Sequence, residues 1–434
     1  MNLSYLDQLK PSPLALFRHI KIPGRKTLNF LSGDVGFKPD PQVVERYKQA
    51  LDEPDSNLYP PLYGVPALRE AAADYLSRIL GTKFTPDEVG ITAGGVAAIS
   101  ISHFALLFNR KGRALSFSPY WTPMKNQPQL FGGKFVTVPL DSRFQFDPER
   151  IEYTIAQEGK IDLFEMNTPH NPTGKVFTLS ELEALAEILK KNDIYLALDI
   201  PYWNIVYDGK QPSIYSVPGM EELTIINYSF SKEHNVTGYR MGLIASKNKE
   251  FMNKIASPFI QFFNTVNHPG QKAMAKALEL GLNPKNLQVL KQKRDLLISR
   301  LNRIAGINCI TPHGAYYAFP DFSGVKNRIP PRQMTRAEFQ LIREMGIGEE
   351  KYDEIKDRYS WQLFRHFLDC DPEYSIVTAP GDQFGEEWDG YLRFSFSKPD
   401  ENDINNCMDI LEQKLGTRVS PQSESRYSKH INPI

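Results

Sequence analysis

The sequence has few cysteines, and none are arranged as a metal site or a disulfide framework. Only Cys309, Cys370 and Cys407 occur in 434 residues, far apart and without CxxC spacing. Their odd number and wide separation argue against both a zinc site and a set of disulfides. We therefore expect free, mostly buried thiols in a reducing compartment, and no bound metal.

Long apolar runs and an excess of charge of one sign are also missing. No window approaches the roughly 18 apolar residues of a membrane-spanning helix, and the 51 basic and 51 acidic side chains cancel. Residues 1–7 show no basic segment followed by an apolar core, as a targeting signal would. We expect a cytoplasmic protein that binds neither nucleic acid nor membrane.

What remains is the composition of an ordinary globular chain. Apolar residues make up 41% and charged residues 24% of the 434 positions, and this length exceeds what one hydrophobic core usually serves. Two domains, or one large domain with a satellite, are expected.

Short apolar stretches alternate with amphipathic helical patterns in the first half of the chain. The predicted strands are 88–92, 114–117, 134–140, 163–167 and 194–198. The alternation favours a largely parallel sheet with helices on both faces. Ligands of such sheets bind beyond the carboxyl ends of the strands. The candidate residues in the loops at those ends are Gly95, Trp121, Asn171, Asp199 and Lys232.

The pattern changes after residue 270. Residues 270–303 predict one long helix leading out of the first domain, and 306–310, 315–319 and 390–396 predict strands of a smaller α+β domain. The segment 325–372 is charged and aromatic, with partly helical spacing. The tail over 416–434 is polar, and we expect it to be loosely held.

One predicted strand runs into a glycine turn that opens a helix. Gly94 and Gly95 follow the strand 88–92, and small and apolar residues come next. This arrangement presents backbone N–H groups to a phosphate. The GxGxxG pattern is absent, so a dinucleotide site is disfavoured, and a plain packing turn remains the alternative.

The densest group of reactive side chains follows the apolar run 225–228. It contains Ser229, Ser231, Lys232 and, eight residues after the lysine, Arg240 between two glycines. A lysine amine forms a Schiff base when burial or nearby positive charge keeps it neutral, and hydroxyls with an arginine suit a phosphate. Pyridoxal phosphate carries both an aldehyde and a phosphate. A solvated loop lysine is the alternative that this stretch alone leaves open.

Four motifs, in order and spacing, resemble the pyridoxal-phosphate-dependent aminotransferases of class I/II, the aspartate aminotransferase fold family. They are Tyr59-xxxx-Gly64 with Leu68–Glu70, Asn171–Gly174, Asp199-xx-Tyr202, and Ser229-x-Ser231-Lys232 with Gly238-x-Arg240-x-Gly242. The resemblance covers roughly residues 28–412. It implies an α/β large domain with a mostly parallel sheet covered by helices on both faces, a smaller α+β domain, and a homodimer.

The resemblance also implies domain boundaries. The expected parts are an N-terminal arm with part of the small domain over 1–45, a large cofactor-binding domain over 46–295, a small C-terminal domain over 296–415, and the polar tail over 416–434.

The roles implied by the resemblance centre on pyridoxal 5'-phosphate. Lys232 would form the aldimine and move the proton at the substrate α-carbon, and Asp199 would keep the pyridine nitrogen protonated. Tyr202 and Asn171 would bond the ring's phenolic oxygen. The further cofactor-binding residues would be Gly95, Val96, Trp121, Ser229, Ser231, Arg240 and, across a two-fold interface, Tyr59. Arg393, with Gly33 and Asn171, would bind the substrate, the arginine through its α-carboxylate.

The expected activity is amino-group transfer from an L-amino acid to a 2-oxo acid by a ping-pong mechanism. A neutral or aromatic side chain is favoured, because Val96 and Phe262 or Phe263 stand where some relatives carry a cation. Arg328 or Arg332 of the segment 325–372 would be the other source of such a cation. Ile200-Pro201 and Glu233-His234 depart from the family pattern, so a carbon–sulfur lyase or synthase on the same fold is the alternative. A non-catalytic cofactor-binding protein is disfavoured, because every acid–base residue is present.

Overall fold

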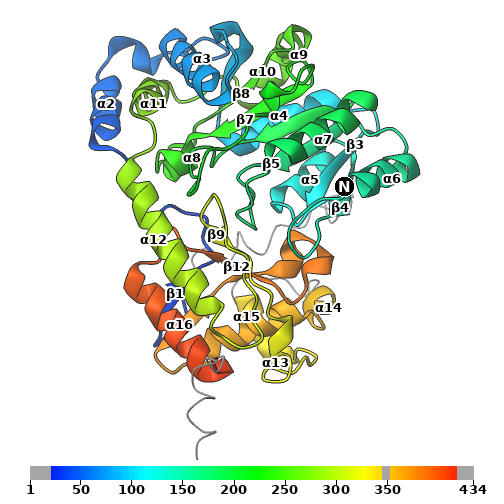
Figure 1. Cartoon of the computed structure of the whole chain (residues 1–434). Coiled ribbons are helices and arrows are strands. Elements are labelled where there is room, and N and C mark those ends of the chain that lie inside the picture. The colour runs from blue at the N-terminus through cyan, green and yellow to red at the C-terminus, as the bar shows by residue number, and fades with distance from the viewer. Residues whose placement is uncertain (1–20, 345–351, 418–434) are drawn as a thin grey trace, which may run out of the picture.

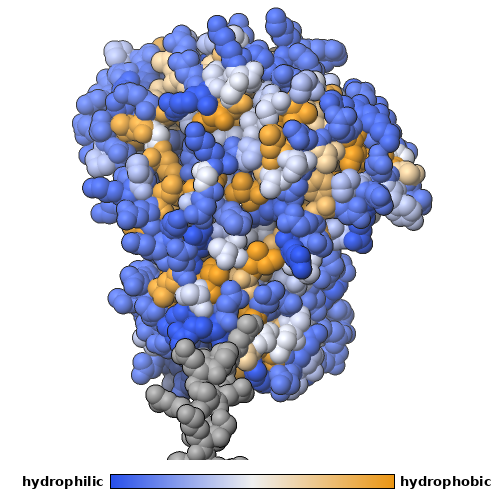
Figure 2. All heavy atoms as spheres, viewed as in Figure 1, coloured by the Kyte–Doolittle hydropathy of each residue, from blue (hydrophilic) through white to orange (hydrophobic). Residues whose placement is uncertain are grey.

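The computed structural model describes residues 21–344 and 352–417. Residues 1–20 of the predicted N-terminal arm, and all but the start of the polar tail predicted over 416–434, lie outside the described residues. Within the described ranges, no helix is both long enough and apolar enough to cross a membrane. The face seen in Figure 2 is mostly hydrophilic, with hydrophobic residues in scattered patches.

A seven-stranded sheet forms the centre of the upper body of the molecule (Figure 1), in the order β2-β8-β7-β6-β5-β3-β4. Only β8 in this sheet runs antiparallel to its neighbours, and the other pairs are parallel. The strands are β2 (Val89–Thr92), β3 (Arg113–Ser118), β4 (Lys134–Pro139), β5 (Leu163–Asn167), β6 (Tyr195–Asp199), β7 (Thr224–Ser229) and β8 (Gly242–Ser246). The predicted α/β class with a mostly parallel sheet is confirmed.

The strands of this sheet are buried on both faces because helices pack on them. All residues of β2, β5, β7 and β8 are buried, as expected for a sheet covered on both faces. The helices of this body are α2 (Pro41–Leu51), α3 (Pro66–Leu80), α4 (Gly95–Leu107), α5 (Pro123–Leu130), α6 (Pro148–Glu158), α7 (Leu179–Lys191), α8 (Phe230–Glu233), α9 (Lys249–Lys254), α10 (Ala256–Phe263) and α11 (His268–Leu280).

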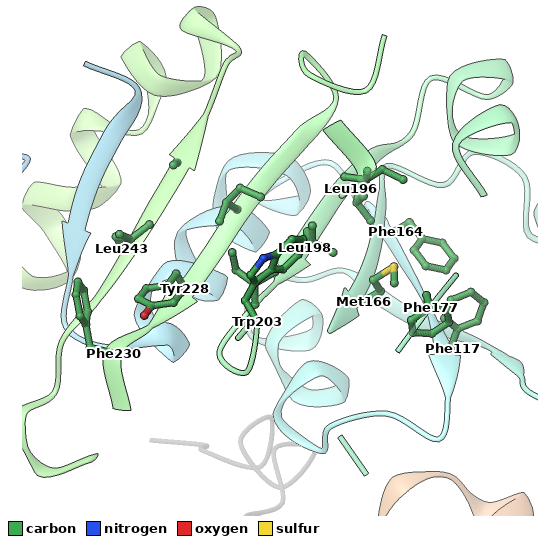
Figure 3. Close-up of a cluster of buried hydrophobic side chains, with 14 of the residues drawn as sticks. Phe117, Phe164, Met166, Phe177, Leu196, Leu198, Trp203, Tyr228, Phe230 and Leu243 are labelled. Atoms are coloured by element: carbon green, nitrogen blue, oxygen red, sulfur yellow. The ribbon is translucent and has the colours of Figure 1, made fainter. Parts of the chain in front are cut away.

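The two faces of the sheet carry different cores. One core contains Phe164 and Met166 of β5 with Phe117, Phe177 and Leu198, which Figure 3 shows packed together. Leu163 alternates with them along β5 and joins a second core with residues of α4, α9 and α10. Side chains of odd-numbered β5 residues therefore face α4, because successive side chains of a strand point to opposite faces.

The lower body contains two small sheets and the remaining helices. β1 (Lys26–Asn29) pairs in parallel with β10 (Tyr374–Val377), and β12 (Leu392–Ser395) lies between β11 (Ala379–Pro380) and β9 (Tyr317–Ala318). The helices are α12 (Pro284–Leu301), α13 (Arg336–Glu344), α14 (Tyr352–Ile355), α15 (Tyr359–Asp369) and α16 (Glu401–Leu415). Figure 1 shows α12 running from the upper body into the lower one.

Three predicted elements of the C-terminal half were wrong in their extent. The single helix over 270–303 is two helices, because Gly281 has a positive φ of 70° and the Asn283 side chain then caps α12 with Pro284 in its first turn. The strand predicted over 306–310 is not a strand, and only Asn308 forms a single bridge, to Asp321. The strand over 315–319 is reduced to β9.

One of the contacts between the two bodies joins a pair of loops near the end of β3. The backbone N–H of Tyr120 donates to the Phe384 carbonyl at 2.9 Å, and the Thr122 hydroxyl donates to the Gln383 carbonyl at 3.1 Å. Trp388 Nε1 donates to the Ser118 hydroxyl at 3.0 Å. The loop 381–388 of the lower body is therefore fixed on the loop 118–122, beside the sheet edge where the candidate residues lie.

Candidate active site

Lys232 meets a residue of the N-terminal segment. It lies in the single turn of α8 directly after β7, and its Nζ donates to the Gly33 carbonyl at 2.7 Å. The same carbonyl accepts from the Tyr316 hydroxyl at 3.0 Å. A Cβ on Gly33 would lie 3.1 Å from the Tyr317 hydroxyl, so glycine is required for this close approach. The lysine amine is thus aimed at the junction of both bodies.

Asp199 ends β6 at the same edge and is 5% exposed. Burial raises its pKa well above the usual range for aspartate, the negative charge of Glu165 raises it further, and the positive charge of Lys232 opposes the rise. A cation that reaches a buried carboxyl of this kind favours its ionised form.

Tyrosines from two parts of the chain enclose this junction. The hydroxyls of Tyr202, after β6, and Tyr317, in β9, lie 2.9 Å apart, and the rings of Tyr202 and Tyr316 meet edge to face at 5.2 Å. All three are nearly fully buried, and burial raises each pKa above the usual range for tyrosine. They are therefore neutral hydrogen-bonding groups.

Arg393 in β12 is a buried cation, 5% exposed. Its Nη1 donates to Asn171 Oδ1 at 3.0 Å and its Nη2 to the Leu31 carbonyl at 2.8 Å. Its guanidinium lies 4.6 Å from the Tyr317 ring centre and 5.0 Å from that of Phe384. Within residues 21–344 and 352–417 its Nε has no partner. Burial lowers the pKa of Arg393, so a carboxylate would be a favourable partner.

A second cluster lies at the start of α4. Gly94 has φ of 93°, and a Cβ there would lie 2.7 Å from Arg240 Nη2. A Cβ on Gly95 would lie 3.0 Å from the Ser229 Cβ. The Ser231 hydroxyl is buried, and no partner for it is found among the described residues. Free amides of a first helical turn, an arginine and two hydroxyls form a site for a dianion.

Most of the predicted site residues come together, but three stand apart from the contacts above. Trp121 is half-buried in the loop that touches 381–388, and the neighbouring Tyr120 is buried. Val96, in the first turn of α4, is 39% exposed. Tyr59 is 82% exposed, between α2 and α3, so its side chain points out of the single chain.

Sequence reasoning did not single out Tyr316, Tyr317 or Phe384 as site residues. The first two fell in a predicted strand, and the third in a stretch with no recognisable motif. No sequence signal marked the Tyr316-Tyr317 pair, because two tyrosines in a strand are typical of a core. No group of three or more His, Cys, Asp or Glu side chains is placed to hold a metal ion in the described ranges.

Comparisons with known proteins agree with this geometry. The family model described as aminotransferase class I and II matches residues 25–411. The aspartate/prephenate aminotransferase of Cereibacter sphaeroides is 30% identical over 74% of this chain and 81% of its own length. The aspartate aminotransferase of Sulfolobus acidocaldarius is 29% identical over 88% of both. The structure of Thermus thermophilus aspartate aminotransferase with maleate superposes with a TM-score of 0.76 at 24% identity, over 96% of this chain and 100% of that one.

Proposed function

The chain belongs to the aminotransferases of class I and II, so it is a pyridoxal-phosphate-dependent transaminase, and we propose that it acts on an L-amino acid with a neutral or aromatic side chain. The acceptor is a 2-oxo acid, and the two half-reactions alternate in a ping-pong mechanism. The observation that carries the amino-acid part of the proposal is Arg393, a buried cation between the rings of Tyr317 and Phe384 that suits an α-carboxylate.

The residues fit pyridoxal phosphate on observations of this structure. The unpartnered Ser231 hydroxyl, together with Ser229, Arg240 and the amides at Gly95 and Val96, suits its phosphate. The buried carboxyl of Asp199 suits a pyridinium N–H, and Trp121 is the aromatic residue proposed to stack on the ring. When bound, the cofactor supplies an electron sink for the substrate carbanion.

Each polar side chain then has a defined task in the proposal. Lys232 would hold the cofactor through Nζ and, once freed, would move the proton at the substrate α-carbon as base and then acid. Asp199 would keep the ring nitrogen protonated. The Tyr202 hydroxyl and the Asn171 amide N–H would donate to the ring's phenolic oxygen. Arg393 binds the α-carboxylate, beside Gly33.

Arg328 and Arg332, the two candidates for a distal cation in the segment 325–372, are both engaged elsewhere. Arg328 donates to the Ala305 carbonyl, and Arg332 pairs with Glu338. This supports a neutral or aromatic side chain. The names of the relatives point instead to aspartate as a substrate of those proteins, so aspartate is the competitor to test. Measuring kcat/KM for aspartate, methionine, phenylalanine and leucine tests the side-chain preference. A preference for aspartate above about tenfold overturns the proposal.

One experiment separates transamination from elimination. Holoenzyme given amino acid alone should release one 2-oxo acid per site and then stop until an acceptor oxo acid is added. Continued release of ammonia without an acceptor would instead identify a lyase. No release at all would contradict both.

The proposal includes a cytoplasmic homodimer. Exposed apolar side chains support it, since Leu58, Tyr59, Phe108 and Ile260 are 66%, 82%, 52% and 49% exposed. Phe104 also stacks with Phe108 at 4.5 Å and meets Phe262 at 5.3 Å, which extends this surface from α4 to α10. Apolar surface of this kind is typical of subunit interfaces. The three free cysteines fit a reducing compartment.

A further inference from the structure

A histidine and a glutamate are buried together between α4 and the sheet, and no step above uses them. His103 Nε2 lies 3.1 Å from Glu165 Oε2, and the two side chains are 0% and 1% exposed. The core on this face contains the apolar residues Ala98, Leu163 and Ala197, together with buried Ser116 and Asn227. Because burying two ionisable groups carries a desolvation cost that their attraction often fails to offset, stability alone does not account for the pair.

The register of the sheet brings this pair under Asp199. Glu165 is the register partner of Ala197, and Asn167 is the partner of Asp199. Since side chains alternate along a strand, Asp199 points to the same face as Ala197 and Glu165. Two residues along a strand and one strand across separate Glu165 and Asp199 by roughly 8 Å between Cα atoms.

An ionised Glu165 at this distance would work against an ionised Asp199. Like charges in a protein interior shift the protonation equilibrium of the nearer acid toward its protonated form. The charge of Glu165 is one of the causes that raise the pKa of Asp199. The other charged group acting on Asp199 is Lys232, from α8, which acts in the opposite direction.

We propose that His103 is an imidazolium that neutralises Glu165, so that Asp199 remains ionised against the ring nitrogen of the cofactor. His103 and Glu165 are positioning residues, because they act through Asp199 and touch neither substrate nor cofactor. Within the described part of the chain, His103 Nδ1 and Glu165 Oε1 have no other partner.

This inference rests on the proposed role of Asp199, and the experiment tests the two separately. Holoenzyme is prepared with pyridoxal phosphate carrying ¹⁵N in the ring, whose resonance reports whether that nitrogen is protonated. Wild type and Glu165→Gln should both have a protonated ring nitrogen. His103→Gln should shift the equilibrium toward the unprotonated nitrogen, because the uncompensated charge of Glu165 favours the protonated form of Asp199. A loss in kcat with a smaller change in KM should accompany the shift. The double variant should restore the protonated state, because it removes both charges.

The outcomes are distinct. An unchanged ¹⁵N resonance in His103→Gln, or a double variant no better than His103→Gln, overturns the inference. Asp199→Asn is the control for the proposed function, since an unchanged resonance there would reject the role of Asp199 itself. If His103→Gln does not fold, wild-type holoenzyme is labelled with ¹⁵N-histidine. The His103 resonance is assigned by its absence from the double variant, and its chemical shift reports whether the imidazole is protonated. A neutral His103 imidazole would overturn the inference.

Discussion

At the scale of single residues, the carbonyl of Gly33 fixes the direction of the Lys232 amine. It accepts from Lys232 Nζ and from the Tyr316 hydroxyl, so one backbone oxygen from the N-terminal segment aligns two side chains of the site. A side chain at position 33 would crowd the Tyr317 hydroxyl.

Replacing Lys232 by alanine should abolish the yellow colour of the holoenzyme and lower kcat by more than about 10⁴-fold, because both the covalent attachment and the proton carrier are lost. Borohydride reduction of wild type and peptide mapping should label Lys232. Lys293→Ala is the matched control and should keep the yellow colour and the activity. Lys293 also donates to a backbone carbonyl, that of Ser397, but it lies in the lower body. Label on any other lysine would refute the assignment.

Arg393→Lys should lower kcat/KM for amino acids by about 10- to 150-fold, mainly through KM, because the two parallel N–H donors of the guanidinium are lost. Steady-state kinetics with several amino acids measures this. Arg328→Lys, on a side chain bonded to the Ala305 carbonyl, should leave kinetics unchanged. Equal effects of the two substitutions would exclude Arg393 as the carboxylate site.

The motif residues could be predicted from the sequence because their spacing is local. Asp199 and Tyr202, or Ser229 and Lys232, lie within a few positions of one another. Tyr317 could not be predicted, because its partner Tyr202 is 115 residues away and a tyrosine pair in a strand reads as core. Glu233, noted only as a departure from the family pattern, proves to be buried and to accept from the Tyr75 hydroxyl and the Asn204 backbone N–H.

At the scale of elements, the first turn of α4 depends on two glycines that leave room for Arg240 and Ser229. The sequence identified this turn as a phosphate site or a packing turn. The structure adds the reason for both glycines, since side chains there would meet Arg240 and Ser229. In contrast, the break between α11 and α12 was missed because apolar spacing continues across Gly281, whose conformation ends the helix.

Gly94→Ala should weaken pyridoxal phosphate binding by about tenfold or more, because alanine disfavours φ of 93° and its Cβ would displace Arg240. The affinity of apoenzyme for the cofactor, followed by absorbance, measures this. Gly81→Ala is the control, with a positive φ of 74° and no atom within 4 Å of the added Cβ. It should lower the free energy of unfolding by about 1 kcal/mol and leave cofactor affinity unchanged. A similar loss of affinity in both would contradict the crowding argument.

The loop 381–388 should respond to pH through Asp382. Burial raises the pKa of Asp382 to about 6 from 3.8, although the Ser360 hydroxyl and Trp361 Nε1 donate to its carboxylate. The folded state therefore holds a proton that the unfolded state releases first, so its stabilising effect is present below about pH 4 and is lost as pH rises through about 6.

Asp382→Asn removes this titration. The free energy of unfolding of wild type, minus that of the variant, should fall by up to roughly 3 kcal/mol between pH 4 and pH 7. Urea unfolding at both pH values, at one protein concentration, measures the difference. A difference that is constant or rises with pH would contradict the prediction.

At the scale of the whole molecule, the exposed Tyr59 predicts that each site needs two chains. Lys232→Ala and Tyr59→Phe chains, each weak alone, should regain activity when mixed under conditions of subunit exchange, because one hybrid site combines an intact lysine with an intact tyrosine. The recovered activity should approach half that of wild type per hybrid. Hybrids that form without any gain would reject a role in trans, and a monomer in sedimentation would reject the dimer.

The pairing of β1 with β10 has a consequence for synthesis on the ribosome. Lys26 leaves the ribosome early, but its partner Tyr374 follows only after a delay of roughly 20–70 s at about 5–20 residues per second. During that time the upper body, whose strands end at Ser246, can already assemble. Gly33 is close behind β1 in the chain, so its docking on the lower body awaits the last strands. The nascent enzyme would therefore gain its lysine and phosphate cluster first and its complete active site only near termination.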